Sequence, residues 1–370
     1  MNVNILNENL ELIKVLDNFD SLLWNTRYNS VGDFQLICDK KYFNLMKEGN
    51  KIQNPQDDEY IGIIEYVKVE TDERKKTNKM TVQGRMLESI LSQRVVMEGA
   101  YRKNIQPAEF VSIIVDRNAI NPTEPERKIA GLIMGTKPDS DLGTIDYENA
   151  YSNLLDVVER VTQNAEMGFK IETDIVNKTY TLNLYKGRNL TQGVADNAVV
   201  LSKNFDNVYT SEYERNSRGY KNVVYIKGEG EFKTSLSFGN YTGLDRREMF
   251  IDQTHISRTL SNGTVLDDTD YAKLLQDTVV DKLKNAAKEE ILYNSLNLQS
   301  NYKYKEDFDL GDLVTCSDPD LGFEMDLRIV EINQVWDRKK GYSIYLHLGE
   351  TKTNLKNYIE KIVLTDRRVF

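Results

Sequence analysis

The stretch "LGDLVTCSDPDLGFEMDLRIVEINQVWDRKKGYSIYLHLG", residues 310–349, has the pattern of three β-strands joined by turns. Apolar residues recur at alternate positions along its strands, as a sheet with one buried face requires. The charged run "DRKKG" (337–341) has the composition of a turn between the second and third strands. No pattern of catalytic residues occurs in the stretch. The segment therefore predicts a small antiparallel β unit.

A similar unit occurs much earlier in the chain. "IVEINQV" (329–335) matches "IIEYVKV" (63–69), and a charged turn follows each of them. The matching positions are Gly49, Ile63, Ile64, Glu65, Val69 and Gly84 in the first unit, and Gly311, Ile329, Val330, Glu331, Val335 and Gly349 in the second. Antiparallel meanders often resemble one another, so a chance likeness is the alternative. The coincidence of glycine, glutamate and turn spacing favours two similar β units on one chain.

Length and composition limit the classes of function. The 370 residues predict two or three domains, and a net charge of −10 disfavours non-specific binding to nucleic acid or to anionic membranes. The N-terminus lacks the pattern of a signal peptide, and no apolar run is long enough to span a membrane. Cys38 and Cys316 lie in expected strands, where buried free thiols are typical. We therefore expect synthesis in a reducing cytoplasm, no membrane anchor and no nucleic-acid partner.

The chain between the two units has mixed character. Apolar spacing predicts helices over 107–120 and 147–168, followed by a hairpin over 169–188. Strands are expected from 201 to 251, and a long amphipathic helix from 267 to about Tyr293. The predicted divisions are 1–97 (first β module), 98–200 (inserted α+β domain), 201–266 (mid-chain β region), 267–295 (connecting helix) and 296–370 (second β module with a C-terminal tail).

Residues with catalytic or metal-binding chemistry are sparse. The only histidines are His255 and His347, so no histidine cluster for zinc can be built. The acidic runs at 267–271 and 317–322 fit a helix cap and a turn better than a calcium loop. The glycine-rich run at 228–239 lacks the lysine and serine of a phosphate loop. We expect no catalytic residue, no cofactor and no metal, which favours a structural or interaction protein.

Several strand-and-turn motifs resemble a known family. They are "SVGDFQLIC" (30–38), "GIIEYVKVE" (62–70), "VQGRMLESILSQRVV" (82–96), "YKNVVYIKGEGE" (220–231), "GLDRREMFID" (243–252), "DFDLGDLVTCSD" (307–318) and "LRIVEINQV" (327–335). Together they resemble the baseplate hub, or tail-tip, proteins of long-tailed bacteriophages and phage tail-like particles. The chain is similar to the siphovirus Gp37-like group and to the N-terminal hub part of tail-associated proteins. The resemblance covers nearly the whole chain.

The resemblance implies a mainly β, α+β fold with two similar, ring-forming β-barrel modules. Three chains would form a homotrimer with a pseudo-sixfold ring of six barrels. Such a ring adapts a sixfold tail tube to a threefold spike or fibre and helps to close the tail channel. The implied partners are a second copy of the chain, a tail tube or distal tail protein, a spike or fibre protein and, in the channel, a tape measure protein. The implied location is the tail, or baseplate, of the virion.

Two alternative functions remain open from the sequence. The acidic helix and loops could supply the carboxylates of a cell-wall hydrolase, although no pair can be chosen as acid and base. The chain could also be a receptor- or carbohydrate-binding module of the tail. Hydrolysis of peptidoglycan would distinguish a hydrolase from a hub. Glycan binding by the isolated chain would support the receptor- or carbohydrate-binding module. Only the hub requires an assembly of three copies.

Overall fold

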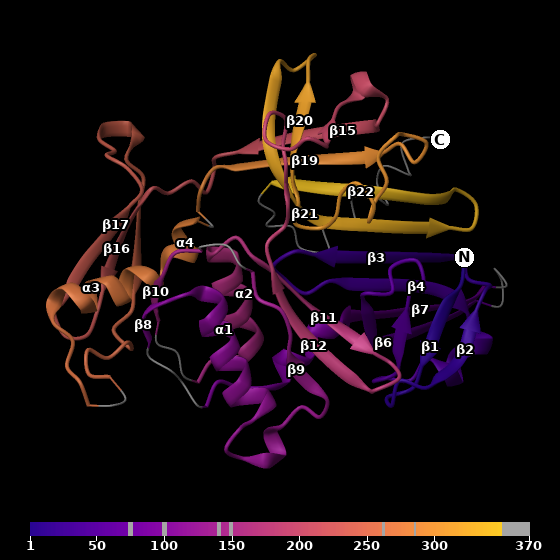
Figure 1. Cartoon of the computed structure of the whole chain (residues 1–370), viewed down its shortest axis with the longest axis horizontal. Helices are drawn as coiled ribbons and strands as arrows, with labels where there is room; N and C mark the ends of the chain where they lie inside the picture. Colours follow the sequence, from indigo (N-terminus) through magenta and orange to yellow (C-terminus); the bar gives the residue numbers. More distant parts are fainter. Residues whose placement is uncertain are drawn as a thin grey trace.

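The computed structural model describes residues 1–72, 77–97, 102–138, 142–147, 151–260, 263–284 and 286–349. The expected C-terminal tail, 350–370, lies outside the described residues, as do residues 73–76 of the first charged turn. The chain is 42% strand and 19% helix, which confirms the prediction of a mainly β, α+β protein. Figure 1 shows a large sheet, a central group of helices, and a lobe set apart from both.

One large antiparallel sheet contains both ends of the described chain. Its strands follow the order β15-β19-β22-β21-β3-β4-β7-β6-β5-β1-β2. The N-terminal strands are β1 (Val3–Leu6), β2 (Leu12–Leu16), β3 (Ser21–Arg27), β4 (Asp33–Asp39), β5 (Lys51–Gln53), β6 (Ile61–Asp72) and β7 (Thr77–Met86). The later strands are β15 (Val208–Asn216), β19 (Glu289–Leu296), β20 (Leu313–Asp318), β21 (Phe323–Asp337) and β22 (Gly341–Gly349). β20 pairs with β21, β13 (Asn189–Leu190) and β14 (Val200–Leu201).

The large sheet is open. In the part of the chain that the structure describes, no sheet closes into a barrel, and the strand order ends at β15 and β2. The first β unit and the second are instead joined edge to edge, because β3 pairs with β21 along seven residues, Ser21–Arg27. Two segments about 300 residues apart in sequence therefore form one continuous surface (Figure 1).

The inserted region contains two helices and two small sheets, one of β8 and β10 and one of β11, β12 and β9. The α-helices are α1 (Pro107–Val115) and α2 (Leu154–Asn164); the strands are β8 (Arg102–Ile105), β9 (Leu132–Met134), β10 (Ile145–Tyr147), β11 (Gly168–Asp174) and β12 (Thr179–Tyr185). The hairpin expected over 169–188 is confirmed, since β11 and β12 pair along their whole length. The expected helix over 147–168 is shorter, because Asn153 caps its start by accepting a hydrogen bond from Leu155 N–H. α1 passes into a π-helical turn at Asp116–Ile120, so the first expected helix is less regular than predicted.

A separate lobe is built around its own apolar core. β16 (Val223–Lys227) lies between β17 (Lys233–Ser237) and β18 (Glu248–Asp252), and α3 (Asp268–Asp277) and α4 (Val280–Lys284) cover one face. The long helix expected from 267 is thus two short helices, and β19 already begins at Glu289. β-branched residues at 278–280 disfavour helix at the break, where Thr278 hydrogen-bonds back to Leu275 O. The remaining helical turns are η1 (Lys40–Leu45), η2 (Leu87–Gln93), η3 (Asp116–Ile120), η4 (Pro125–Arg127), η5 (Lys203–Phe205) and η6 (Gly243–Asp245).

The main core runs through both β units and the inserted helices. Its largest fully buried side chains include Trp24, Phe34, Phe110 and Phe308. The thiols of Cys38 and Cys316 are buried and free, and burial raises the pKa of each to about 12. Across the described ranges, no helix has the length and apolar character needed to span a membrane.

Candidate functional site: the junction of two β units

Two hairpins carry the residues of the predicted repeat. β6 and β7 pair from Ile64 opposite Gly84 to Asp72 opposite Thr77. β21 and β22 pair from Ile329 opposite Leu348 to Asp337 opposite Gly341. In each hairpin the pairing register shifts directly after the isoleucine, which marks a β-bulge. The arms beyond the bulge have the same length.

A glycine at positive φ anchors each hairpin in the same way. Gly49 N–H donates to Ile64 O at 2.9 Å, and Ile64 N–H donates to Asn50 O at 2.8 Å. Gly311 N–H donates to Ile329 O at 2.8 Å, and Ile329 N–H donates to Asp312 O at 2.9 Å. The φ angles are +84° at Gly49 and +90° at Gly311, a region that favours glycine. Both glycine positions are therefore set by the same local geometry.

The hydrogen bonds align the two hairpins one residue away from the sequence alignment. They pair Ile329 with Ile64, so Glu331 corresponds to Tyr66 rather than to Glu65. The turn after Asp337 is one residue shorter than the turn after Asp72, and the sequence alignment already allowed for this difference. Its error was to match Glu331 with Glu65, which is the bulge residue of β6 and corresponds to Val330 of β21. Glu65 is exposed and forms an ion pair with Arg85.

The environments of the repeat residues differ between the hairpins. In the first, Ile64 is buried, Ile63 is half-buried and Val69 is 38% exposed. In the second, Ile329 and Glu331 are buried. Val330 and Val335 are half-buried, and the closing residue Gly349 lies opposite Ile291 of β19. A Cβ atom on Gly84 would lie 1.7 Å from Ile63 O, so this glycine is required by close backbone contact.

A buried charge network holds the junction between β3 and β21. Arg27 on β3 contacts Glu331 on β21 through Nε at 2.7 Å and Asp33 on β4 through Nη2 at 2.7 Å. Its Nη1 also donates to Val31 O at 2.7 Å. His347 on β22 lies 3.7 Å from Glu331 and hydrogen-bonds to Asn333 through Nε2. The network therefore links β3 and β4 of the first unit with β21 and β22 of the second.

Burial and pairing act in opposite directions on the two acids of this network. Burial tends to raise the pKa of Glu331, but Arg27 and His347 lower it below its usual value. The pKa of Asp33 is raised, because burial outweighs the attraction of Arg27 and the charge of Glu331 adds to it. Both acids compete for one guanidinium, and the pairing with Glu331 is the stronger of the two.

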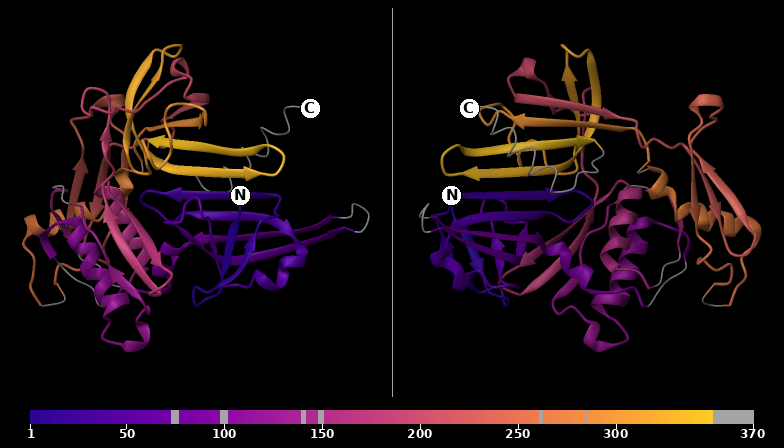
Figure 2. Two further views of the ribbon diagram at one scale, coloured as in Figure 1. Left: turned by 45° about the vertical axis from the view of Figure 1, so that its right-hand side comes forward. Right: turned by 180° about the vertical axis from the view of Figure 1, so that it is seen from behind.

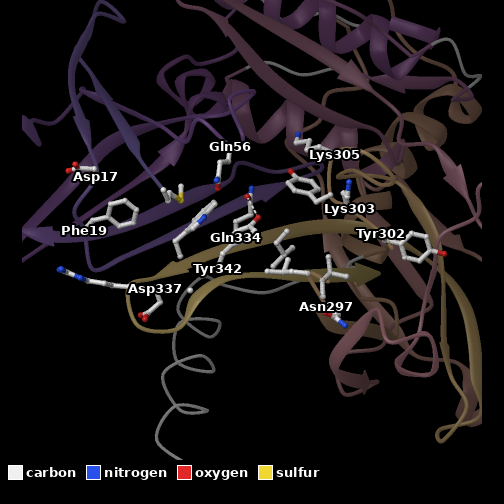
Figure 3. Close-up of a pocket in the computed structure, with 18 of the residues that line it drawn as sticks. Asp17, Phe19, Gln56, Asn297, Tyr302, Lys303, Lys305, Gln334, Asp337 and Tyr342 are labelled. Atoms are coloured by element: carbon white, nitrogen blue, oxygen red, sulfur yellow. Dashed lines mark hydrogen bonds between the residues drawn. The ribbon is translucent and has the colours of Figure 1, made fainter. Parts of the chain in front are cut away.

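A groove of about 890 Å³ lies beside the junction. Figure 3 shows Asp17 and Phe19 at one end, Gln334 and Tyr342 in the middle, and Asn297 and Tyr302 at the other end. Trp336 also lines it, with its ring stacked on Tyr342 at a centroid distance of 4.7 Å. Since Trp336 is only 6% exposed, it forms part of the wall and offers little open surface to a sugar ring.

Lys305 gathers three carboxylates next to this groove. Its Nζ lies 2.8 Å from Glu59, 3.4 Å from Asp57 and 3.5 Å from Asp309. Burial raises the pKa of Asp57 to about 6, while Lys305 opposes that rise. Gln334 Nε2 donates to Asp57 Oδ2 at 2.6 Å, so β21 is tied to the loop after β5. One lysine ammonium thus lies within ion-pair distance of three carboxylates that come from two separate segments of the chain.

The sequence did not indicate Arg27, Asp57 or Lys305 as important residues. They meet only after β3, the loop after β5 and the segment before β20 come together, and no local motif marks them. His347 is buried in β22. Within the described ranges, no group of three or more His, Cys, Asp or Glu residues could hold a metal ion.

Comparison with known proteins identifies relatives of the whole chain. The family model described as Siphovirus ReqiPepy6 Gp37-like protein matches residues 2–350. A 43 kDa tail protein of prophage MuSo2 from Shewanella oneidensis has a similar structure, with a TM-score of 0.58, 13% identity, and 94% and 98% of the two chains covered. A tail protein from Neisseria meningitidis MC58 aligns with a TM-score of 0.55 and 11% identity, over 94% of this chain and 96% of that one.

A third similar structure is the prophage tail protein gp18 from Listeria monocytogenes EGD-e. It has a TM-score of 0.55 and 10% identity, with 98% of each chain covered. No curated protein matches the sequence significantly. At such low identities the three structures establish a shared fold.

Proposed function

Because the chain belongs to the family of Siphovirus ReqiPepy6 Gp37-like proteins, we propose that it is a structural baseplate hub of a phage-type tail. Three copies form a ring in which the two β units alternate around one axis. Each unit supplies one of six similar lobes, which become barrel-like only when neighbouring lobes complete them. Such a ring has threefold symmetry and approximates sixfold symmetry, so it adapts a sixfold tube to a threefold spike.

The observation that carries this proposal is the repeated hairpin. The two hairpins share arm length, bulge and glycine anchor, and the β units to which they belong are joined edge to edge through β3 and β21. We therefore propose that the repeat residues from Gly49 to Gly84 and from Gly311 to Gly349 are equivalent parts of two ring modules. In this view residues 1–97 and 296–349, completed by β15 and β19, form the ring. The inserted domain at 98–200 and the lobe of β16, β17 and β18 widen the cup beneath it.

The proposed partners follow from a position at the end of the tail. One face of the ring binds the tail tube or a distal tail protein, and the other binds a spike or fibre protein. A tape measure protein ends in the channel. The hub is synthesised in the cytoplasm of the bacterial host and is incorporated into the virion tail.

The proposed work is assembly without covalent chemistry. The clustered carboxylates beside the groove are paired with Lys305, and Asp57 among them is 2% exposed. Purified protein is expected to leave peptidoglycan suspensions turbid. Clearing that disappears when Asp57 or Glu59 is replaced would instead support the cell-wall hydrolase.

The mass of the native assembly tests the hub directly. Native mass spectrometry of the full-length protein at micromolar concentration is expected to show a complex of three 42.7 kDa chains. The same complex is expected at the tail end of the intact particle. A stable twofold dimer in solution that also occurs in the particle would contradict the proposal.

A further inference from the structure

Four strands of each β unit correspond in order. In the N-terminal sheet unit the order is β3-β4-β7-β6, and in the C-terminal sheet unit it is β15-β19-β22-β21. The hairpin equivalence fixes the register, because Gly84 corresponds to Leu348. Gly84 lies opposite Phe34, which lies opposite Trp24. Leu348 lies opposite Leu292, which lies opposite Tyr213. Tyr213 of β15 is therefore the counterpart of Trp24 of β3.

The junction inside the chain joins unlike ends of the two units. β21, the last strand of the C-terminal sheet unit, pairs antiparallel with β3, the first strand of the N-terminal sheet unit. In this pairing Asn333 lies opposite Asn25 and Gln334 opposite Trp24. A contact of this type leaves two strands without a counterpart of the junction: the first strand, β15, at one end of the sheet, and the last strand, β6, of which only the first residues pair with β5.

Both outer strands have an open edge in the described structure. Among the described residues, β15 pairs only with β19, and the part of β6 beyond Ile63 pairs only with β7. The β6–β7 hairpin extends beyond the rest of the sheet (Figure 2, left). Tyr66 is 49% exposed and Val69 is 38% exposed on β6, and Tyr209 is 60% exposed on β15. Open strand edges with exposed apolar side chains are sites of pairing with another chain.

We propose that β6 of one copy pairs antiparallel with β15 of a second copy, and so repeats the internal β21–β3 junction between chains. This inference rests on the proposed trimeric hub and names the surface that closes it. The equivalent register places Lys68 opposite Glu214 and Val69 opposite Tyr213. Because the surfaces are heterologous, three chains close a ring and leave no open strand of this kind.

The chemistry of the two edges fits this register. Lys68, which forms an ion pair with Glu70 at 2.6 Å within its own strand, meets the acidic residue Glu214 in this register. Val69 meets an aromatic ring that already packs on Phe323 at 5.1 Å. Opposite-charge and aromatic–β-branched pairs across strands are favourable. One pair is unfavourable, since Glu70 lies opposite Glu212. This mismatch gives the register a distinct signature: Glu70→Lys is expected to strengthen the assembly.

Charge reversal tests the pairing at equilibrium. Lys68→Glu and Glu214→Lys are each expected to raise the concentration needed for assembly by roughly tenfold or more, and the double variant is expected to restore it. Lys14→Glu is the control, because Lys14 is an exposed lysine on β2, the edge strand that lies beyond β5 and β1 in the same sheet. An effect of Lys14→Glu, with none of Lys68→Glu, would move the interface to β2.

Crosslinking of the full-length chain decides the register. Lys68→Cys with Glu214→Cys is expected to give covalent trimers on oxidation or with a short bismaleimide linker. The native thiols of Cys38 and Cys316 are buried, so they do not compete. Either single variant, and Lys14→Cys with Glu214→Cys, are expected to stay uncrosslinked. Native trimers that fail to crosslink would overturn this interface and leave the hub intact. A protein that remains monomeric at every concentration, in solution and in the particle, would overturn both.

Discussion

The β6–β7 and β21–β22 hairpins have the same backbone and opposite surroundings. Beyond the bulge, β21 lies between β22 and β3, and its residues Glu331, Asn333 and Gln334 are all buried. The counterpart residues on β6 are exposed, and there β7 is the only neighbour among the described residues. One hairpin is an internal strand pair, and the other is an edge. In our proposal, the neighbouring strand is supplied inside the chain in one case and by another chain in the other.

Replacing the buried isoleucines at the bulges is expected to cause the largest loss of stability. Ile64 and Ile329 are 1% and 0% exposed, so Ile64→Asp and Ile329→Asp are each expected to cost about 4 kcal/mol or to prevent folding. Val330→Asp is expected to cost much less, because Val330 is half-buried. Urea denaturation compares the three. Equal tolerance of Ile329→Asp and Val330→Asp would show that the assigned inner face is wrong.

Loss of the buried charge network is expected to have the second-largest effect on stability, and to distinguish the β21–β22 hairpin from the β6–β7 hairpin. Glu331→Ala leaves Arg27 buried with Asp33 alone, and a broken buried pair costs roughly 3 kcal/mol. The counterpart change, Tyr66→Ala, is expected to cost less than about 1 kcal/mol in the free chain, since half of that side chain is exposed. The free energy of unfolding of both variants gives the comparison. Similar losses would remove the distinction between an internal strand and an edge.

Acids near the two hairpins are expected to respond oppositely to pH. Glu88, on η2 after β7, has a pKa raised by burial to about 7 from an ordinary value of 4.5. Its contribution to stability is present below pH 4.5 and is lost as pH rises to 7, by at most roughly 3 kcal/mol. The pKa of Glu331 is lowered, so its contribution is present above its ordinary value and is lost as pH falls through the lowered value.

Glu88→Gln isolates the first of these effects. The amide oxygen can still accept the hydrogen bond from Ile171 N–H, which lies 3.0 Å from Glu88 Oε1. Asp57 acts in the same direction as Glu88, so the difference between wild type and variant is the informative quantity. Denaturation from pH 4.5 to 8 is expected to show a flatter profile for Glu88→Gln. An unchanged profile would place the titration elsewhere.

Replacing the glycines that anchor the hairpins, Gly49 and Gly311, is expected to cause the smallest losses of stability. At Gly49 a Cβ atom would meet Glu8 Oε1 at 2.9 Å, the end of a flexible side chain. At Gly311 it would meet the ring of Tyr28 at 2.3 Å, and that ring is buried. Gly49→Ala is expected to cost about 1 kcal/mol from the positive φ alone, and Gly311→Ala about 1–2 kcal/mol more. Thermal denaturation of the two variants tests this order. A larger loss of stability in Gly49→Ala than in Gly311→Ala would contradict it.

Local patterns predicted much of the fold, and long-range pairing explains what they missed. Alternation predicted the hairpins, and the β11–β12 hairpin is where it was expected. The register between the two units was placed one residue away, because the alternation of apolar residues does not show that the bulge falls at Glu65 in β6 and at Val330 in β21. The β3–β21 junction depends on segments about 300 residues apart, and Arg27, Asp57 and Lys305 become neighbours only through it. No local sequence motif predicts contacts between such distant segments.

A map of the tail tip in the intact particle tests the central claim most directly. The account predicts six similar lobes around a threefold axis and a central channel, with the β6–β7 and β21–β22 hairpins in alternating, equivalent positions. Each β6 edge would face a β15 edge of the next copy. A map in which the two hairpins occupy unrelated positions, or in which two copies are related by a twofold axis, would contradict the account.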